Sequence, residues 1–192
     1  MMEQFEQWYE NRHDYQKAYK ERTGKKIVGY FCTYSPEELF YAADILPVRI
    51  IGSHEIQDVT EPHIFGMYCP FCRDVLAQGL KGKYDYLDGI TIGQSCLHLR
   101  QAYVSWDIHR NPGWSHYLPM PHHVQSKRAL PFLVEEYKVL KKKLEDWIGR
   151  EITNDDLRRG TEIVNKSRQV MKKIYELRKM DPPPITGAES MY

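Results

Sequence analysis

The sequence predicts an α/β protein, with a Rossmann-like parallel sheet of about four strands, covering helices and a long C-terminal helical hairpin. Short apolar runs rich in strand formers alternate with helical segments over the first 125 residues. Glycine, proline and capping residues stand between these segments, where turns are needed. Two long stretches with apolar residues at helical spacing then follow.

The elements can be assigned in order along the first 125 residues. A helix is predicted over residues 3–22, because aromatic residues recur there at helical spacing and Gly24 follows. Ser35 as N-cap, Pro36 as first residue and Glu38 as third form a capping box for the next helix, which continues over residues 39–45. Further helices are expected at 70–80 and 96–110. Strands are expected at 27–31, 48–52, 86–93 and, short or at an edge because of its prolines, 117–121.

The last third of the chain changes to a helical pattern. Apolar residues from Leu133 to Trp147 repeat at helical spacing, and Thr153 opens a second long helix with a capping box. These patterns divide the chain into an α/β lobe (1–125), a helical hairpin packed on it (126–181) and a proline-rich segment (182–192). We expect that last segment to be a linker to a second lobe that this sequence does not contain.

Composition excludes several classes of protein. The 192 residues carry a formal net charge of +1, so no global field attracts nucleic acid or an acidic membrane. No apolar run approaches the roughly 18 to 20 residues that span a bilayer, and the first ten residues lack the apolar region of a signal peptide. We therefore expect a cytoplasmic protein. The sequence has no Walker A motif and no G-x-G-x-x-G, so it does not resemble an ATPase component.

Polar residues follow three of the predicted strands. Tyr34 and Ser35 come after the first strand, His54 and Glu55 after the second, and Cys96 after the third. Ligands of parallel sheets bind beyond the carboxyl ends of the strands. His54 and Glu55 are candidates for supplying a proton or a hydrogen bond, because histidine titrates near neutral pH. Ser35 is a further catalytic candidate, although its predicted role as a helix cap already explains it.

The pair Cys69 and Cys72, in the motif C-P-F-C, has three interpretations. A dithiol redox motif at a helix N-terminus would have a lowered thiol pKa. Half of a zinc site would need two more ligands, for which His63 and His98 do not have the usual spacing. An iron–sulfur site would combine one of these cysteines with Cys96 and a ligand from elsewhere. The residues alone leave all three open.

The surroundings of these cysteines resemble the 2-hydroxyacyl-CoA dehydratase and benzoyl-CoA reductase family. There a cysteine opens a helix, a strand follows, and a second cysteine opens the next helix. The segments that carry the likeness are 29–52, 68–73, 84–90, 96–100 and 152–168, which together cover almost the whole chain. The segments 60–73 and 94–96 are most similar to the smaller, substrate-binding subunits of ATP-dependent benzoyl-CoA reductase.

This resemblance implies a [4Fe–4S] cluster held by three cysteines, two from the first lobe and one from the second. By matching residues, Cys69 and Cys96 are the first-lobe ligands, and Cys72 is an extra cysteine or a substitute ligand. The third ligand has no counterpart in this sequence. The family also implies a homologous second subunit, an ATP-hydrolysing iron–sulfur activator that donates a low-potential electron, and an aromatic or 2-hydroxyacyl CoA thioester as substrate.

Two other functions remain as alternatives. A dithiol oxidoreductase would need Cys69 and Cys72 and would not need Cys96. An inactive lobe would fold and act only in binding a partner, which the lack of a third cysteine ligand favours.

Overall fold

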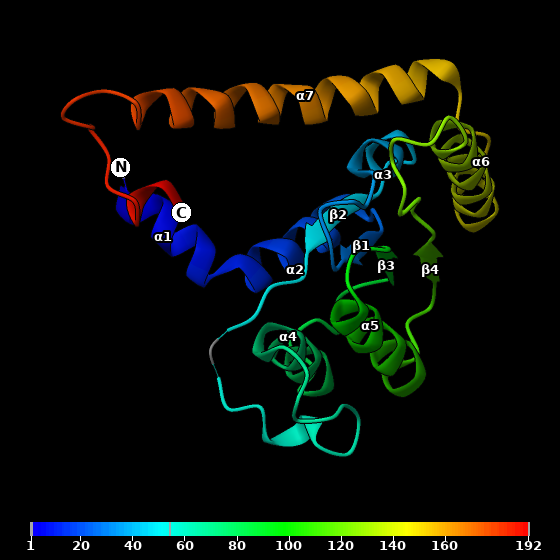
Figure 1. The fold of residues 1–192 in the computed structure, drawn as a ribbon, viewed down its shortest axis with the longest axis horizontal. Coiled ribbons are helices and arrows are strands. Elements are labelled where there is room, and N and C mark those ends of the chain that lie inside the picture. Colours follow the sequence, from blue (N-terminus) through cyan, green and yellow to red (C-terminus); the bar gives the residue numbers. More distant parts are fainter. Residues whose placement is uncertain (1, 54, 192) are drawn as a thin grey trace.

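The computed structural model describes residues 2–53 and 55–191, and it contains a four-stranded parallel sheet (Figure 1). The strands lie in the order β2, β1, β3, β4, and all three neighbouring pairs are parallel. Their bounds are β1 Ile27–Tyr30, β2 Leu46–Arg49, β3 Gly89–Gly93 and β4 Ser115–Leu118. The predicted α/β class and number of strands are confirmed. The two strands that contain or adjoin prolines, β2 and β4, lie at the edges, where a missing N–H is tolerated.

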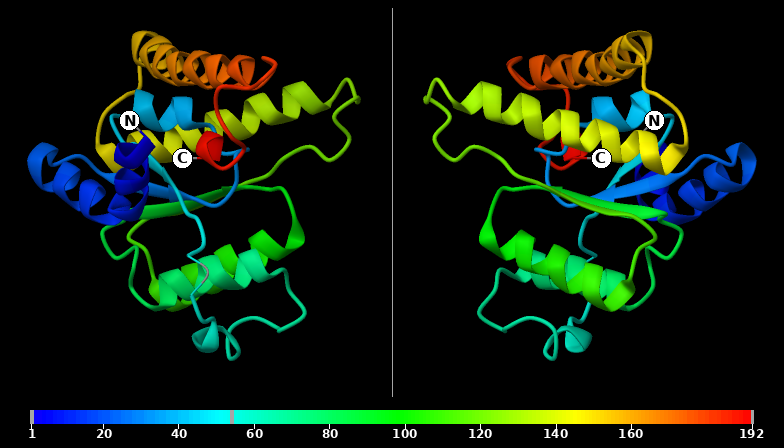
Figure 2. Two further views of the ribbon diagram at one scale, coloured as in Figure 1. Left: turned by 90° about the vertical axis from the view of Figure 1, so that its left-hand side faces the viewer. Right: turned by 90° about the vertical axis from the view of Figure 1, so that its right-hand side faces the viewer.

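Helices cover both faces of the sheet (Figure 2). On one face lie α4 (Pro70–Leu80) and α5 (Leu97–Arg110), which pack together over a core that includes Phe31, Leu76 and Ile90. On the other face lie α3 (Glu37–Ala42), α6 (Ala129–Ile148) and α7 (Asn154–Leu177). The burial of apolar side chains against both faces is what stabilises a parallel sheet of this kind.

The N-terminal segment forms two helices where the sequence predicted one. Helix α1 (Met2–Glu10) and helix α2 (Arg12–Thr23) are separated at Asn11, whose ψ of 18° departs from helical geometry. Gly24 ends α2 with φ +64°, as expected for a left-handed C-cap. Lys20 ties α2 to the amino edge of the sheet, because its ammonium group lies 2.9 Å from the Asp88 carboxylate.

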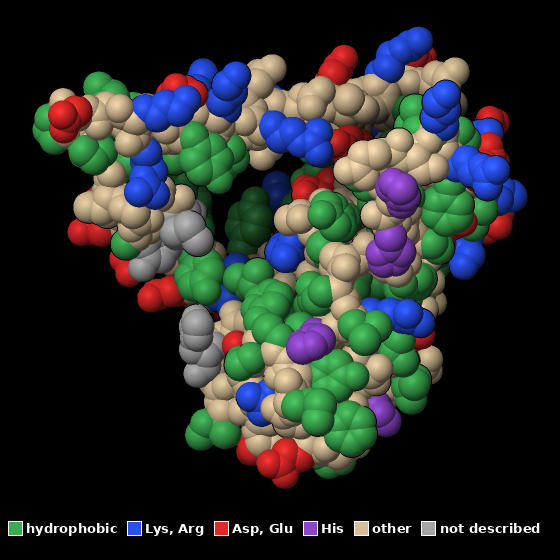
Figure 3. All heavy atoms as spheres, in the orientation of Figure 1, with side chains coloured by type: hydrophobic (Ala, Val, Ile, Leu, Met, Phe, Trp, Pro, Cys, Tyr) green, Lys and Arg blue, Asp and Glu red, His purple; other side chains and the backbone are tan. Residues whose placement is uncertain are grey.

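The two predicted long C-terminal helices are present and cross at a steep angle (Figures 1 and 2). Leu140 and Leu144 of α6 share a core with Val28 of β1 and Phe40 of α3. Helix α7 packs mainly on α3, and its C-terminal half spans a hollow in the surface (Figure 3). The domain boundaries near residues 125 and 181 stay predictions.

Glycine at position 160 allows the close approach of α7 to α3. A Cβ at Gly160 would lie 2.2 Å from the carbonyl oxygen of Glu38, which is inside van der Waals contact. The predicted capping box at the start of α7 is confirmed, since Thr153 and Asp156 exchange side-chain to backbone hydrogen bonds. Two short 3-10 helices, Asp58–Thr60 and Glu189–Met191, complete the structure. Within the described residues, no helix is both long and apolar enough to cross a membrane.

Candidate functional site

The chain leaves two central strands in opposite directions at the carboxyl edge of the sheet. After β1 it turns to α3 on one face, and after β3 it turns to α5 on the other face. The carboxyl ends of β1 and β3 therefore form a topological switch point, which is where open α/β sheets bind ligands. The residues nearest this point are Tyr34 and Ser35 after β1, and Gln94 to Cys96 after β3.

Ser35 lies at this switch point and does not cap α3, contrary to the sequence prediction. The N-cap of α3 is Pro36, and no side chain caps the helix. The buried Ser35 hydroxyl instead accepts a hydrogen bond from the backbone N–H of Gly93, at 3.2 Å. The reason is that the end of β3 presents an N–H that needs a partner in the interior. Ser35 thus joins the loop after β1 to the end of β3.

Gly93 allows the same two segments to touch. A Cβ on Gly93 would lie 2.8 Å from the carbonyl carbon of Tyr34, so a larger residue would push the loops apart. The Tyr34 side chain itself is 55% exposed and borders the edge of the sheet.

Cys69 and Cys96 occupy equivalent positions on neighbouring helices. Cys69 is the N-cap of α4 with Pro70 as first residue, and Cys96 is the N-cap of α5. The Cys96 sulfur accepts a hydrogen bond from the N–H of Leu99 at 3.3 Å. The N–H of Cys69 lies 2.8 Å from Nδ1 of His98 in the first turn of α5, so the two helix N-termini and their positive dipole ends lie close together. That these two cysteines act together as ligands stays a prediction.

Backbone amides stabilise the thiolate form of Cys69. The N–H of Cys72 is the main group that lowers the Cys69 pKa below its usual value, and the N–H of Phe71, the Cys72 thiol and the charge of Arg73 act in the same direction. None of these amides reaches the Cys69 sulfur as a full capping hydrogen bond. Their combined field nevertheless favours a thiolate at this helix N-terminus.

Cys72 has the opposite character. It is 2% exposed, and burial followed by the charges of Cys69 and Cys96 raises its pKa to about 12. Its thiol interacts with the sulfurs of both other cysteines. Cys72 is therefore a buried, protonated group beside the other two sulfurs.

His98 connects the two cysteine-bearing helices. Its Nδ1 accepts a hydrogen bond of 2.8 Å from the backbone N–H of Cys69, and its ring meets the edge of Tyr68 at 4.9 Å between centroids. The accepting Nδ1 assigns the ring proton to Nε2. Sequence reasoning considered His98 as a zinc ligand without the usual spacing. The one local signal was its place two residues after Cys96.

The cysteines do not by themselves make a metal site within the described residues. Among residues 2–53 and 55–191, no three side chains of His, Cys, Asp or Glu meet at a geometry that would hold a metal ion. The zinc interpretation gains nothing from His63, whose ring instead packs against His109 with centroids 4.1 Å apart. A metal or cluster bound through Cys69 and Cys96 would need ligands beyond these.

Of the two candidates after β2, Glu55 is not brought to the cysteines. His54 lies outside the described residues. Glu55 pairs with Lys83 at 3.4 Å, just beyond the C-terminal end of α4, whereas Cys69 stands at the N-terminal end. The 11 residues of α4 separate these ends by about 16 Å. A catalytic role for Glu55 stays a prediction.

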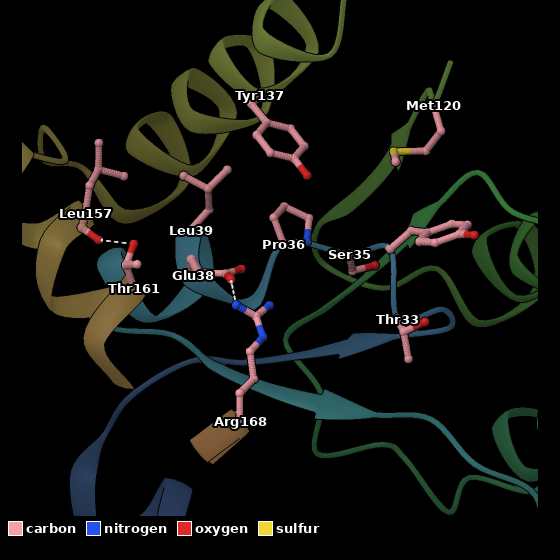
Figure 4. Close-up of a pocket in the computed structure, with 11 residues that line it drawn as sticks. Thr33, Ser35, Pro36, Glu38, Leu39, Met120, Tyr137, Leu157, Thr161 and Arg168 are labelled. Atoms are coloured by element: carbon pink, nitrogen blue, oxygen red, sulfur yellow. Dashed lines mark hydrogen bonds and ion pairs between the residues drawn. The ribbon is translucent and has the colours of Figure 1, made fainter. Parts of the chain in front are cut away.

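A cavity of about 420 Å³ lies on the α3 side of the switch point (Figure 4). Its walls come from four parts of the chain: the loop after β1 with α3, the segment after β4, α6 and α7. Glu38 and Arg168 form an ion pair of 2.8 Å across one side of it. The lining residues are Thr33, Tyr34, Ser35, Pro36, Glu38, Leu39, Met120, Tyr137, Leu157, Thr161 and Arg168. Sequence reasoning missed this cavity, because its walls are far apart in the chain.

Several known proteins are similar to this chain. One of the subunits of benzoyl-CoA reductase from Thauera aromatica is 26% identical over 86% of this chain and 43% of its own length. The (R)-phenyllactyl-CoA dehydratase beta subunit of Clostridium sporogenes is 28% identical over 98% of this chain and 50% of its own length. The beta subunit of (R)-2-hydroxyglutaryl-CoA dehydratase from Acidaminococcus fermentans is 30% identical over 86% and 44%.

The chain thus spans about half the length of the relatives it matches. The sequence model described as "2-hydroxyglutaryl-CoA dehydratase, D-component" matches residues 32–192, which include the switch point, all four cysteines and the cavity. This agrees with the resemblance found from the cysteine-bearing segments. The chain belongs to the 2-hydroxyglutaryl-CoA dehydratase D-component family.

Proposed function

We propose that this chain supplies Cys69 and Cys96 as two ligands of a [4Fe–4S] cluster in an enzyme that acts on a CoA thioester. The observation that carries the proposal is the placement of both cysteines at the N-termini of packed helices, beside the switch point of the sheet. Thiolates at such positions are stabilised by backbone N–H groups and helix dipoles. The relatives named as CoA dehydratase and reductase subunits support the class of substrate.

The residues present fit a partial ligand set. The lowered pKa of Cys69 favours the deprotonated form that binds iron, and His98 fixes the Cys69 backbone relative to α5. The raised pKa of Cys72 keeps that thiol protonated, so Cys72 is expected to donate a hydrogen bond to a neighbouring sulfur instead of replacing a ligand. When bound, such a cluster would supply a low-potential electron for reduction of the thioester-conjugated substrate, leading to ring reduction or to loss of a hydroxyl group.

A partner subunit and a separate activator are part of the proposal. Large apolar side chains stand exposed around the two thiols: Phe65, Met67 and Leu97 are 74%, 87% and 67% exposed. Exposed apolar groups of this size commonly mark contact surfaces. The relatives are named as subunits, which supports a protein partner. We further propose that an ATP-hydrolysing iron–sulfur protein delivers the electron, since this sequence has no nucleotide-binding motif of its own.

The test is anaerobic reconstitution with ferrous iron, sulfide and an excess of a small thiol, which can complete the ligand set. Wild type is expected to bind iron and acid-labile sulfide with a visible absorption band. Cys69→Ser and Cys96→Ser should each lose them. Cys32→Ala is the matched control, because Cys32 is a buried core cysteine outside the site. Iron retained in both site variants, or lost equally in the control, would refute the assignment of ligands.

A dithiol function is the second candidate, and one observation favours it. Cys69 has a lowered thiol pKa and Cys72 a raised one, which is the asymmetry of an attacking and a resolving thiol. This function predicts rapid exchange with an oxidised small dithiol that Cys72→Ser abolishes and Cys96→Ser leaves intact. The cluster function predicts instead that Cys96→Ser abolishes iron binding and that Cys72→Ser leaves it intact. The two variants therefore discriminate between the candidates.

A further inference from the structure

The elbow between α1 and α2 presents aromatic side chains to solvent. Phe5 and Trp8 lie one turn apart on α1, and their rings meet edge to face with centroids 5.4 Å apart. Trp8 is 53% exposed, and Tyr15 of α2 is 62% exposed. Together with Arg12 and Gln16, these two residues line a hollow of about 310 Å³ at the elbow. Tryptophan, tyrosine and arginine are the residues most enriched among those that dominate binding energy at protein interfaces.

Helix α1 lacks a surface to pack on within its own chain. Residues 3–10 are all exposed, including the aromatic ones. The helix has nine residues, fewer than the roughly 12 to 15 that an isolated helix needs to be stable in water. Short helices of this kind are stabilised chiefly by packing of an apolar face, so α1 is expected to gain stability from a surface that covers its aromatic stripe.

Hydrogen bonds fix the angle of the elbow. The Asn11 side-chain amide donates to the carbonyl oxygen of Gln7 at 2.9 Å. The Arg12 guanidinium donates to the carbonyl oxygen of Tyr9 at 2.9 Å and also lies over the Tyr9 ring. Helix α2 is in turn tied to the sheet by Lys20. These contacts hold α1 in place on α2, so the surface that covers its aromatic stripe has to come to the elbow.

The C-terminal half of α7 has an exposed apolar face. Gly160 and Val164 are the buried residues of this helix, and they lie in its N-terminal half, which packs on α3. The same row of residues continues at helical spacing with Met171 and Tyr175. Both of these side chains are exposed, because α7 extends beyond α3 and spans the hollow in the surface (Figures 1 and 3). This half of α7 is therefore an apolar surface without a cover among the described residues.

The charges of the two surfaces are complementary. Helix α1 has no lysine or arginine and carries three carboxylates, Glu3, Glu6 and Glu10. After Val164, α7 has one carboxylate, Glu176, and four cations, which are Lys166, Arg168, Lys172 and Lys173. Opposite charges around facing apolar surfaces favour encounter and fix their mutual orientation. An acidic aromatic elbow thus matches a basic apolar helix of the same chain.

We propose that two copies of this chain associate through these surfaces, with the elbow of each copy packed on the C-terminal half of α7 of the other. Trp8 and Tyr15 cover Met171 and Tyr175, and the carboxylates of α1 lie beside the lysines of α7. A two-fold axis makes the two contacts equivalent and closes the assembly at a dimer. The inference does not depend on the function proposed above, since neither surface contains a cysteine.

The test is sedimentation velocity of the whole chain over a range of concentrations, at low salt and with a reductant that prevents disulfides between copies. Trp8→Ala alters the elbow and Met171→Asp alters α7; both positions are exposed, and circular dichroism checks that each variant is folded. Phe132→Ala is the matched control, because Phe132 is an exposed aromatic residue on α6, outside both surfaces. If Trp8→Ala unfolds α1 itself, Tyr15→Ala tests the elbow from α2.

Wild type is expected to dimerise with a dissociation constant on the order of tens of micromolar, because the contacts are small and partly polar. Trp8→Ala and Met171→Asp should each weaken association at least about tenfold, since each substitution occurs twice in the dimer. The control should stay within about twofold of wild type. Raising the salt concentration from about 50 to about 500 mM should weaken wild-type association several-fold, because it screens the charges.

A mixture of the two variants provides the sharpest measurement. A dimer of one Trp8→Ala copy and one Met171→Asp copy has one elbow and one α7 that are both intact and face each other. The mixture should therefore associate more tightly than either variant alone. Two substitutions that act on separate contacts would give no such recovery.

Three results would overturn the proposal. Wild type could be monomeric even at about 1 mM, the two variants could associate as wild type does, or the mixture could show no recovery. A monomeric wild type that both substitutions destabilise in urea would place the elbow on α7 of the same chain and would replace the dimer by an intrachain contact.

Discussion

His116 on β4 provides a quantitative test of how burial controls this fold. Its side chain is 4% exposed, its ring stacks on Trp114 with centroids 6.0 Å apart, and neither ring nitrogen has a hydrogen-bond partner within the described part of the chain. Burial, with a smaller contribution from the charge of Lys143, lowers the His116 pKa from 6.5 to about 4. The neutral ring is therefore the form that the folded chain accepts.

The sign and size of the effect follow from linkage. Between pH 6.5 and 4 the unfolded chain binds a proton on His116 that the folded chain does not, so the free energy of unfolding falls as pH falls. Because the His116 pKa is lowered from 6.5 to about 4, the free energy of unfolding is about 3 kcal/mol smaller at pH 4 than at neutral pH. Above about pH 7 this loss of stability is absent. His116→Leu has similar volume and loses no hydrogen bond, so the variant should lack this contribution and change little at about pH 7.5.

Urea unfolding followed by circular dichroism at several pH values between about 7.5 and 4 measures the difference between the two proteins. His13 also has its pKa lowered to about 4, mainly by burial, but it is present in both and cancels in the difference. The variant should become the more stable protein as pH falls. If the free energy of unfolding depends on pH in the same way in both proteins, or if the variant is already several kcal/mol less stable near neutral pH, His116 is solvated or hydrogen-bonded. Either result would refute this reasoning.

Three further predictions concern positions where one contact joins distant segments or caps a helix. His98→Ala removes the acceptor for the Cys69 N–H, so it should lower the free energy of unfolding by about 1 kcal/mol and lower iron retention after reconstitution. His98→Asn, whose amide oxygen can accept the same hydrogen bond, should retain more iron than His98→Ala. Equal iron retention by the two variants would contradict a positioning role. Gly160→Ala should destabilise the chain by about 1 to 3 kcal/mol in urea, because its methyl group overlaps the Glu38 carbonyl, and an unchanged midpoint would mean that α7 does not pack there. Thr153→Ala should cost about 1 kcal/mol and lower the melting temperature through loss of the α7 cap, while Thr153→Ser should restore most of it.

Local signals in the sequence sufficed for the number of strands, for most of the helices and for the positions of Cys69 and Cys96 at helix starts, but not for the break at Asn11. Pro70 after Cys69 marks a helix start, because proline fits the first position, where no N–H is needed. Gly24 marks a helix end through its positive φ. The strands shifted by a few residues where the pattern of apolar residues was continuous. Each of these features depends on neighbours within a few residues, and such neighbours are visible in the sequence.

Contacts between distant segments had no such signal. Ser35 fitted a capping box, yet its hydroxyl bonds to Gly93, 58 positions away, because the sheet brings the two loops together. His98 similarly accepts from the Cys69 N–H across 29 positions. Both interactions follow from the order of strands and from which face each helix covers. Neither is encoded in the residues next to the donor or acceptor.

The divergence of the chain at β1 and β3 explains why the cysteines and the cavity lie on opposite faces of the sheet. Helices α4 and α5 present Cys69 and Cys96 on one face, while α3, α6 and α7 enclose the cavity on the other. The loops after β1 and β3 are the shared boundary, held together by Ser35 and Gly93. Gly93→Ala should therefore destabilise the chain by about 1 to 3 kcal/mol in urea, because its methyl group overlaps Tyr34, and an unchanged midpoint would mean that the two loops do not touch.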